Sequence, residues 1–156
     1  MAFTLVEALV AAVILAMAVT AIILPFTSAL QSQATDAKRT LAVSLAQEMM
    51  EEVIAKPFSD SAGVKTPGFE AGENRWNCNC IDDYDGYTEE DGQIRSFDGQ
   101  VLSDPEAAGL SRHVACAYVY VSGQDTGQPS TFIRVTVEVR YKGQPLVTLS
   151  RLVFAH

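Results

Sequence analysis

The chain contains few charged residues, and positive charge is especially scarce. Its 156 residues include 11 Lys and Arg against 19 Asp and Glu, which gives a formal net charge of -8. The basic residues occur singly or in pairs, whereas contact with phosphate needs clustered Lys and Arg. The sequence therefore predicts no nucleic-acid contact, and its acidity alone names no other partner.

Residues that commonly carry catalysis are also scarce. His113 and His156 are the only histidines, and neither lies in a nucleophile motif. The glycines between residues 123 and 127 indicate turns, and no phosphate-binding glycine motif is present. We therefore expect no enzymatic activity.

Only three cysteines occur: Cys78, Cys80 and Cys116. The spacing of the first two is C-x-C with no second pair, which is too few ligands for a four-ligand zinc site. In an exported head we expect one disulfide and one remaining thiol. Cys116 pairs with either of the other two in this interpretation, because a bridge between Cys78 and Cys80 would be strained. Three free thiols are the alternative.

The N-terminal part of the chain is strongly apolar. From Ala8 to Phe26 no residue is charged, and Thr20 carries the only polar side chain. About 20 apolar residues suffice for a helix to span a bilayer. The segment is therefore predicted to be a transmembrane helix. A buried core helix is the alternative, but a chain of this size would struggle to surround it.

Glu7 is the one acid at the edge of this apolar run. A carboxylate costs up to about 3 kcal/mol if it enters the bilayer, so it needs a cation partner. No Lys or Arg occurs before Lys38, which leaves an N-terminal amine as the nearest positive charge. In a helix Glu7 cannot easily reach the amine of its own chain. We expect it to reach the amine of a neighbouring subunit.

The residues from Phe3 to Glu7 read F-T-L-V-E and are followed at once by the apolar run. This motif resembles that of the type IV prepilin family, which includes pilins and type II secretion pseudopilins. The resemblance implies that prepilin peptidase cuts between Ala2 and Phe3 and methylates the new amine. It also implies that Glu7 pairs with that amine in the adjacent subunit. The implied location is the inner membrane with a periplasmic head, and an extracellular filament after assembly.

The helical pattern continues beyond the apolar run. An apolar stripe steps by three or four residues from Leu30 to Ile54, and Pro57 ends it. We predict one helix from about Thr4 to Lys56, kinked at Pro25; two helices separated at Pro25 are the alternative. The stretch around Leu45–Val53 resembles that of minor pilins, including subunits of mannose-sensitive haemagglutinin-type pili, minor pilin V and pseudopilin I.

The remaining sequence predicts a small β-rich head. Residues 59–112 are irregular, with short strands expected around Ile94–Val101. Alternating patterns then predict strands at His113–Val121 and Ile133–Tyr141, and a turn at residues 142–144 leads into a strand at Leu146–Phe154. We expect an α+β fold in which an antiparallel sheet packs on the helix stripe. The expected regions are a residual leader at 1–2, a transmembrane or filament-core helix at 3–28, its amphipathic half at 29–57 and a periplasmic head at 58–156.

An acidic run in the irregular part is a candidate calcium site. Carboxylates on a loop with a glycine turn suit calcium, and Asp83, Asp85 and either Glu89 or Glu90 could supply them. The spacing differs from the twelve-residue calcium loop, although the pseudopilin resemblance favours a calcium-binding head. A solvated turn is the preferred alternative.

The predicted function is that of a structural subunit, a minor pilin or pseudopilin of a type IV pilus or type II secretion-like filament. Its expected partners are other subunits of that filament, the inner membrane and prepilin peptidase. The alternative is a membrane-anchored periplasmic module that binds a ligand or calcium through its head.

Overall fold

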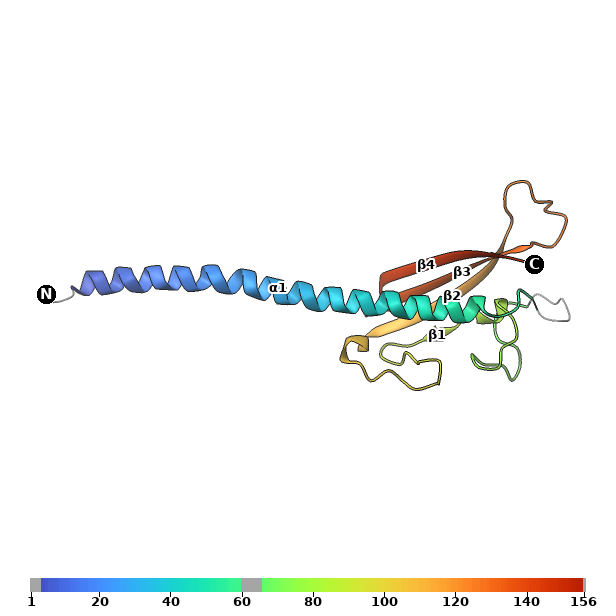
Figure 1. Ribbon diagram of the computed structural model, residues 1–156, viewed down its shortest axis with the longest axis horizontal. Helices are drawn as coiled ribbons and strands as arrows, with labels where there is room; N and C mark the ends of the chain where they lie inside the picture. Colours follow the sequence, from blue (N-terminus) through green and yellow to red (C-terminus); the bar gives the residue numbers. More distant parts are fainter. Residues whose placement is uncertain (1–3, 60–65, 156) are drawn as a thin grey trace. The chain divides into compact units, whose positions relative to one another are not determined.

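A computed structural model describes residues 4–59 and 66–155 of the chain (Figure 1). The fold is α+β, as predicted, with one long N-terminal helix and a four-stranded antiparallel sheet. The elements are helix α1 (Leu5–Ile54) and strands β1 (Thr88–Glu89), β2 (Leu110–Val119), β3 (Phe132–Tyr141) and β4 (Gln144–Phe154). Two 3-10 turns, Asp82–Tyr84 and Pro105–Ala107, lie in the irregular region. The chain forms two compact units, Met1–Ala37 and Lys38–His156.

Helix α1 runs without interruption through Pro25, so the one-helix prediction is confirmed. Its first turn is capped by Thr4, whose hydroxyl accepts a hydrogen bond from the Glu7 N–H at 3.3 Å. Proline lacks an N–H, and the residue before a proline disfavours the helical conformation. Pro57 therefore accounts for the end of the helix shortly after Ile54.

The strands follow the order β1-β2-β3-β4, and each pairs with its neighbour in antiparallel fashion. The predicted turn between β3 and β4 is confirmed, because Tyr141 pairs with Gln144 across a two-residue loop. Both loop residues have positive φ, 48° at Lys142 and 77° at Gly143. A tight hairpin of this kind needs left-handed backbone at both positions, which glycine adopts without strain.

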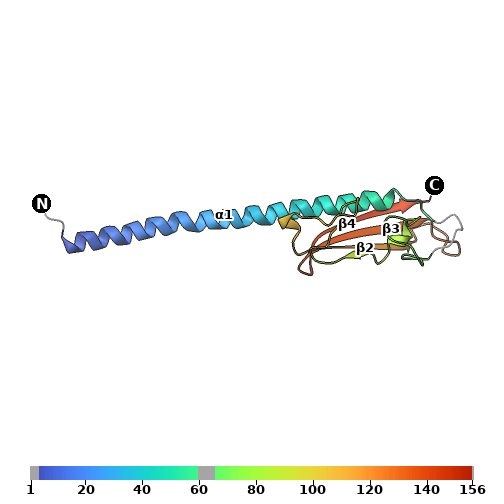
Figure 2. The same ribbon diagram turned by 90° about the horizontal axis from the view of Figure 1, so that it is seen from below.

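The core of the second unit lies between the C-terminal part of α1 and one face of the sheet (Figures 1 and 2). The helix contributes residues at the spacing predicted from the sequence, and the strands contribute alternate residues. The buried apolar residues of α1 are Ala42, Leu45, Ala46, Met49, Met50 and Val53. Those of strands β2 and β3 are Leu110, Val114, Cys116, Ile133, Val135, Val137 and Val139.

The irregular region differs from the prediction in two places. The expected strands around Ile94–Val101 amount to one isolated bridge between Arg95 and Val101. Strand β1 lies instead in the acidic run and pairs with β2, placing Glu89 opposite Arg112. Only two residues form β1, so no alternation is available to reveal it.

Candidate functional site

The N-terminal unit presents an apolar helical surface. Every side chain described between Thr4 and Ala37 is exposed. The helix is long and apolar enough to cross a membrane. The large apolar side chains exposed along it are Leu5, Val6, Leu9, Val10, Val13, Ile14, Leu15, Met17, Val19, Ile22, Ile23, Phe26 and Leu30.

Such a surface needs a non-aqueous environment. Burying one large aliphatic or aromatic side chain is worth roughly 1.5–3 kcal/mol relative to leaving it in water. Contiguous apolar patches beyond a few hundred Å² mark membrane or protein contacts. A lipid bilayer or an apolar surface of another protein would provide such an environment.

Glu7 lies in the first turn of α1. Among the residues that the structure describes, no group donates a hydrogen bond to its carboxylate or forms an ion pair with it. Thr4 and Glu7 have the T-x-x-E spacing of a capping box, and the Thr4 half of that box is present. Glu7 is thus compatible with both helix capping and pairing with an external cation. The predicted processing residues Ala2 and Phe3 lie outside the described residues.

A buried ion-pair network in the head was not predicted from the sequence. Its centre is Glu89, whose two carboxylate oxygens each accept from a different arginine. Arg75 Nη1 lies 3.0 Å from Glu89 Oε1, and Arg112 Nη2 lies 2.6 Å from Glu89 Oε2. The Glu89 carboxylate therefore neutralises the positive charges of both Arg75, which lies in a loop, and Arg112, which lies in the sheet.

The same network reaches helix α1 through Glu52. Arg75 contacts this carboxylate with two nitrogens, Nε at 2.8 Å and Nη2 at 2.6 Å. Arg112 donates to the Leu45 carbonyl oxygen at 3.1 Å, which adds a second tie to the helix. Both arginines also donate to the Arg95 carbonyl oxygen, each at 2.9 Å. These bonds join the helix, the sheet and the irregular region.

The electrostatics of the network favour the charged forms at Glu52 and Arg75. Burial alone would raise the pKa of Glu52, but hydrogen bonds and charge from Arg75 outweigh it and hold the pKa below the usual 4.5. Burial likewise opposes the charged form of Arg75, yet Glu52 and Glu89 raise the pKa of its guanidinium. The pair is therefore ionised at neutral pH.

The sequence contained one signal for this network. Arg112 shares its strand parity with Leu110 and Val114, both fully buried, so it occupies a core position of β2. A charge at such a position must be paired. Its partners come from distant segments with no periodic pattern, which is why sequence reasoning missed them.

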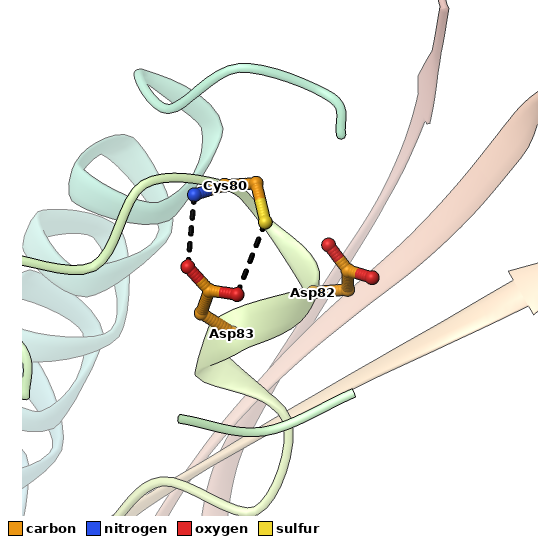
Figure 3. Close-up of side chains that lie close together, drawn as sticks. All are labelled: Cys80, Asp82 and Asp83. Carbon is orange, nitrogen blue, oxygen red and sulfur yellow. Dashed lines mark hydrogen bonds between the residues drawn. The ribbon is translucent and has the colours of Figure 1, made fainter. Parts of the chain in front are cut away.

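All three cysteines are buried thiols in the structure. Cys78 donates to the Arg75 carbonyl oxygen at 3.4 Å, and Cys80 donates to Asp83 Oδ1 at 3.0 Å (Figure 3). Cys116 lies on the inner face of β2, where burial and then nearby aspartates raise its pKa to about 12. A disulfide between Cys116 and one of the other two stays a prediction.

The four acids of the predicted calcium site have separate surroundings. Asp83 Oδ2 accepts from the N–H groups of Asn79 and Cys80, and Asp85 Oδ1 accepts from the Cys116 N–H. Glu89 is bound to two arginines, while Glu90 is exposed. Within the described part of the chain, only Asp83 of these four belongs to a compact group of potential metal ligands. Calcium binding stays a prediction.

We expect Glu89→Ala to destabilise the head by about 3–5 kcal/mol, because it leaves two buried guanidinium groups without their shared carboxylate. The measurement is urea unfolding of the full chain in detergent micelles, followed by fluorescence of Trp76, the single tryptophan. Glu138→Ala is the matched control, since it breaks a pair with Arg140 that is partly open to solvent and should change the midpoint much less. Equal shifts in the two variants would contradict the structural role of the network.

Acid should weaken the head through Glu52. Because its pKa is lowered on folding, its contribution to stability is complete above about pH 4.5 and is lost as the pH falls through the folded-state pKa. In Glu52→Gln, the unfolding midpoint should be lower at neutral pH and should change less between about pH 7 and pH 3.5. Glu48→Gln, at an exposed position of the same helix, should keep the wild-type pH dependence. An unchanged pH dependence in Glu52→Gln would contradict this assignment.

Comparisons of the chain with protein-family models, with curated proteins and with solved structures find no match.

Proposed function

We propose that this chain is a structural subunit, a minor pilin or pseudopilin, of a type IV pilus or type II secretion-like filament. Its N-terminal helix waits in the inner membrane and then packs against the same helices of neighbouring subunits. The observation that carries the proposal is the exposed apolar surface of α1 with Glu7 in its first turn.

The apolar surface suits both states of such a subunit. In the membrane, side chains such as Leu9, Ile14 and Phe26 contact lipid; in the filament they contact other helices. Transfer between these environments keeps the apolar area out of water throughout, so extraction does not lose the hydrophobic stabilisation. A helix that is apolar all round is typical of a segment buried in a membrane or an assembly.

Glu7 supplies specificity in this proposal. A carboxylate near the end of an apolar helix is costly in lipid or in a packed assembly unless a cation meets it. The N-terminal amine of the adjacent subunit is such a cation, and pairing with it fixes how far one helix is displaced along the next. The apolar side chains alone would tolerate several displacements.

The head provides the second part of the function. Its sheet packs on the C-terminal part of α1, so every assembled helix displays a head. The resemblance to minor pilins supports a subunit whose head determines its position in the filament. The periplasm is the proposed location of the head before assembly, and the extracellular filament its location afterwards.

We expect both Glu7→Gln and Glu7→Ala to reduce incorporation into filaments by about tenfold or more. A charge-assisted hydrogen bond contributes roughly 1.5–3 kcal/mol, and 1.4 kcal/mol corresponds to a factor of ten. The measurement is the amount of the chain in sheared filaments relative to the membrane fraction, in cells that contain the filament system.

The two substitutions also separate the charge of Glu7 from its helix-capping role. Glutamine preserves the capping box and alanine does not. If Glu7→Gln assembles like the wild type while Glu7→Ala fails, Glu7 acts as a cap and the pairing with an amine is wrong. If both variants assemble normally, the filament proposal loses its principal support and the alternative of a membrane-anchored binding module gains it. Glu48→Gln is the control for a charge change elsewhere on α1.

Processing provides an independent prediction. Mass spectrometry of the chain from cells with prepilin peptidase should find Phe3 as the first residue, with a methylated amine. Cells without the peptidase should retain Ala2 and the residues before it. Retention of Ala2 in assembled filaments would contradict the proposed processing.

A further inference from the structure

A thiol and two carboxylates lie together at the start of the 3-10 turn in the irregular region. The ligand atoms of Cys80, Asp82 and Asp83 all lie within 4.8 Å of one another, and all three residues are buried. In the view of Figure 3, the Cys80 sulfur lies between the two carboxylates. The group requires no contribution from Asp85, Glu89 or Glu90.

One atom of this group lacks a partner. Asp82 is 1% exposed, and its Oδ2 accepts a hydrogen bond from the Tyr118 hydroxyl at 2.7 Å. Its Oδ1 is buried and accepts no hydrogen bond. A buried oxygen of this kind costs roughly 1–3 kcal/mol, and more when it is charged. Backbone N–H groups satisfy the buried carboxylate of Asp83, which accepts two hydrogen bonds from them. No such bonds satisfy Oδ1 of Asp82.

The charge of the group is also uncompensated. Neither Asp82 nor Asp83 forms an ion pair with any Lys, Arg or His in the described part of the chain. The nearby network of Glu52, Arg75, Glu89 and Arg112 has two charges of each sign and is balanced within itself. Buried carboxylates without a cation are unfavourable, so a bound cation would relieve both the charge and the unpartnered oxygen.

From this geometry we propose that Cys80, Asp82 and Asp83 bind a divalent transition-metal ion of the zinc type. Sulfur is a good ligand for zinc and a poor one for calcium, which takes oxygen ligands. Binding replaces the S–H bond of Cys80 by a metal–sulfur bond and releases one proton to solvent. The ion accepts an electron pair from Asp82 Oδ1, and water completes its coordination.

Some side-chain movement is needed. Ligand distances of about 2.0–2.3 Å place the ligands of one tetrahedral ion about 3–4 Å apart. The group lies within reach of that separation, because its ligand atoms are at most 4.8 Å apart. Cys80 would exchange its hydrogen bond to Asp83 for the metal. The site is independent of filament assembly, so failure of one proposal does not decide the other.

The probe is Co²⁺ added to the purified full chain in detergent, with Zn²⁺ and then Ca²⁺ as competitors. We expect one Co²⁺ per chain with a cobalt–thiolate charge-transfer band, displaced by Zn²⁺ and not by equal Ca²⁺. Cys80→Ser should abolish the band, and Asp82→Asn should weaken binding by about tenfold or more. Cys78→Ser and Asp85→Asn are the matched controls and should leave the band unchanged.

Thermal unfolding distinguishes a variant that has lost metal binding from one that folds poorly. With a chelator present, Asp82→Asn should unfold at the wild-type temperature or above it, because it removes a buried unpaired charge. With Zn²⁺ present, the wild type and the two control variants should gain stability, and Asp82→Asn should gain less than they do. The proposal is overturned by the absence of a band, by a band that persists in Cys80→Ser, or by equal competition from Ca²⁺. Destabilisation of Asp82→Asn by the same amount with and without Zn²⁺ would overturn it as well.

Discussion

The head depends on the neutralisation of two guanidinium groups inside its core. Arg112 occupies an inward position of β2 and is fully buried, so it cannot reach water. Glu89 lies opposite it on β1 and shares its carboxylate with Arg75, which in turn contacts Glu52 on α1. The hydrophobic core packs helix on sheet, but these polar bonds fix the irregular region against both. A chain with so little regular structure between residues 66 and 109 needs directional contacts of this kind.

The two parts of helix α1 present different surfaces. In the unit from Lys38 onward, α1 buries one side, which includes Leu45, Met49 and Val53, under the sheet. In the unit before it, the described side chains are exposed, and from residue 8 to residue 26 all of them except Thr20 are apolar. A one-sided stripe is satisfied within the chain, whereas an all-round apolar surface requires lipid or other molecules. This division between internal and external packing is the physical basis of the proposed subunit role.

Periodic patterns were sufficient to predict the long elements, α1 and strands β2 to β4, but not the two-residue strand β1. Many residues contribute to the apolar stripe from Ala42 to Val53, because all of them pack on the sheet. Many residues likewise contribute to the alternation through β2, β3 and β4. A single residue that departs from either pattern therefore did not obscure it. The turn between β3 and β4 could also be predicted, because it depends on the adjacent residues Lys142 and Gly143. The polar network escaped prediction because Glu52, Arg75 and Glu89 are far apart in sequence and follow no period. For Glu7, the sequence predicted no cation partner within the same chain, and no described residue forms an ion pair with it.

The cysteines show a different limit of sequence reasoning. Their number and spacing favour a disulfide and argue against zinc, because a zinc site of cysteines and histidines needs further such residues at fixed spacing. The structure instead groups Cys80 with two aspartates that follow it almost directly. In the sequence, Asp83, Asp85, Glu89 and Glu90 form one candidate calcium site. In the structure they contact different groups and lie in different environments.

The Arg95 carbonyl oxygen has a consequence for how the head opens. It accepts hydrogen bonds from both Arg75 and Arg112, so contacts from a loop and from the sheet converge on one peptide group. Displacing that peptide group removes a hydrogen bond from both arginines at once. Backbone amides of the surrounding loops should therefore exchange with solvent in one cooperative event rather than by independent fraying. The irregular region should therefore open cooperatively, as helices and sheets usually do.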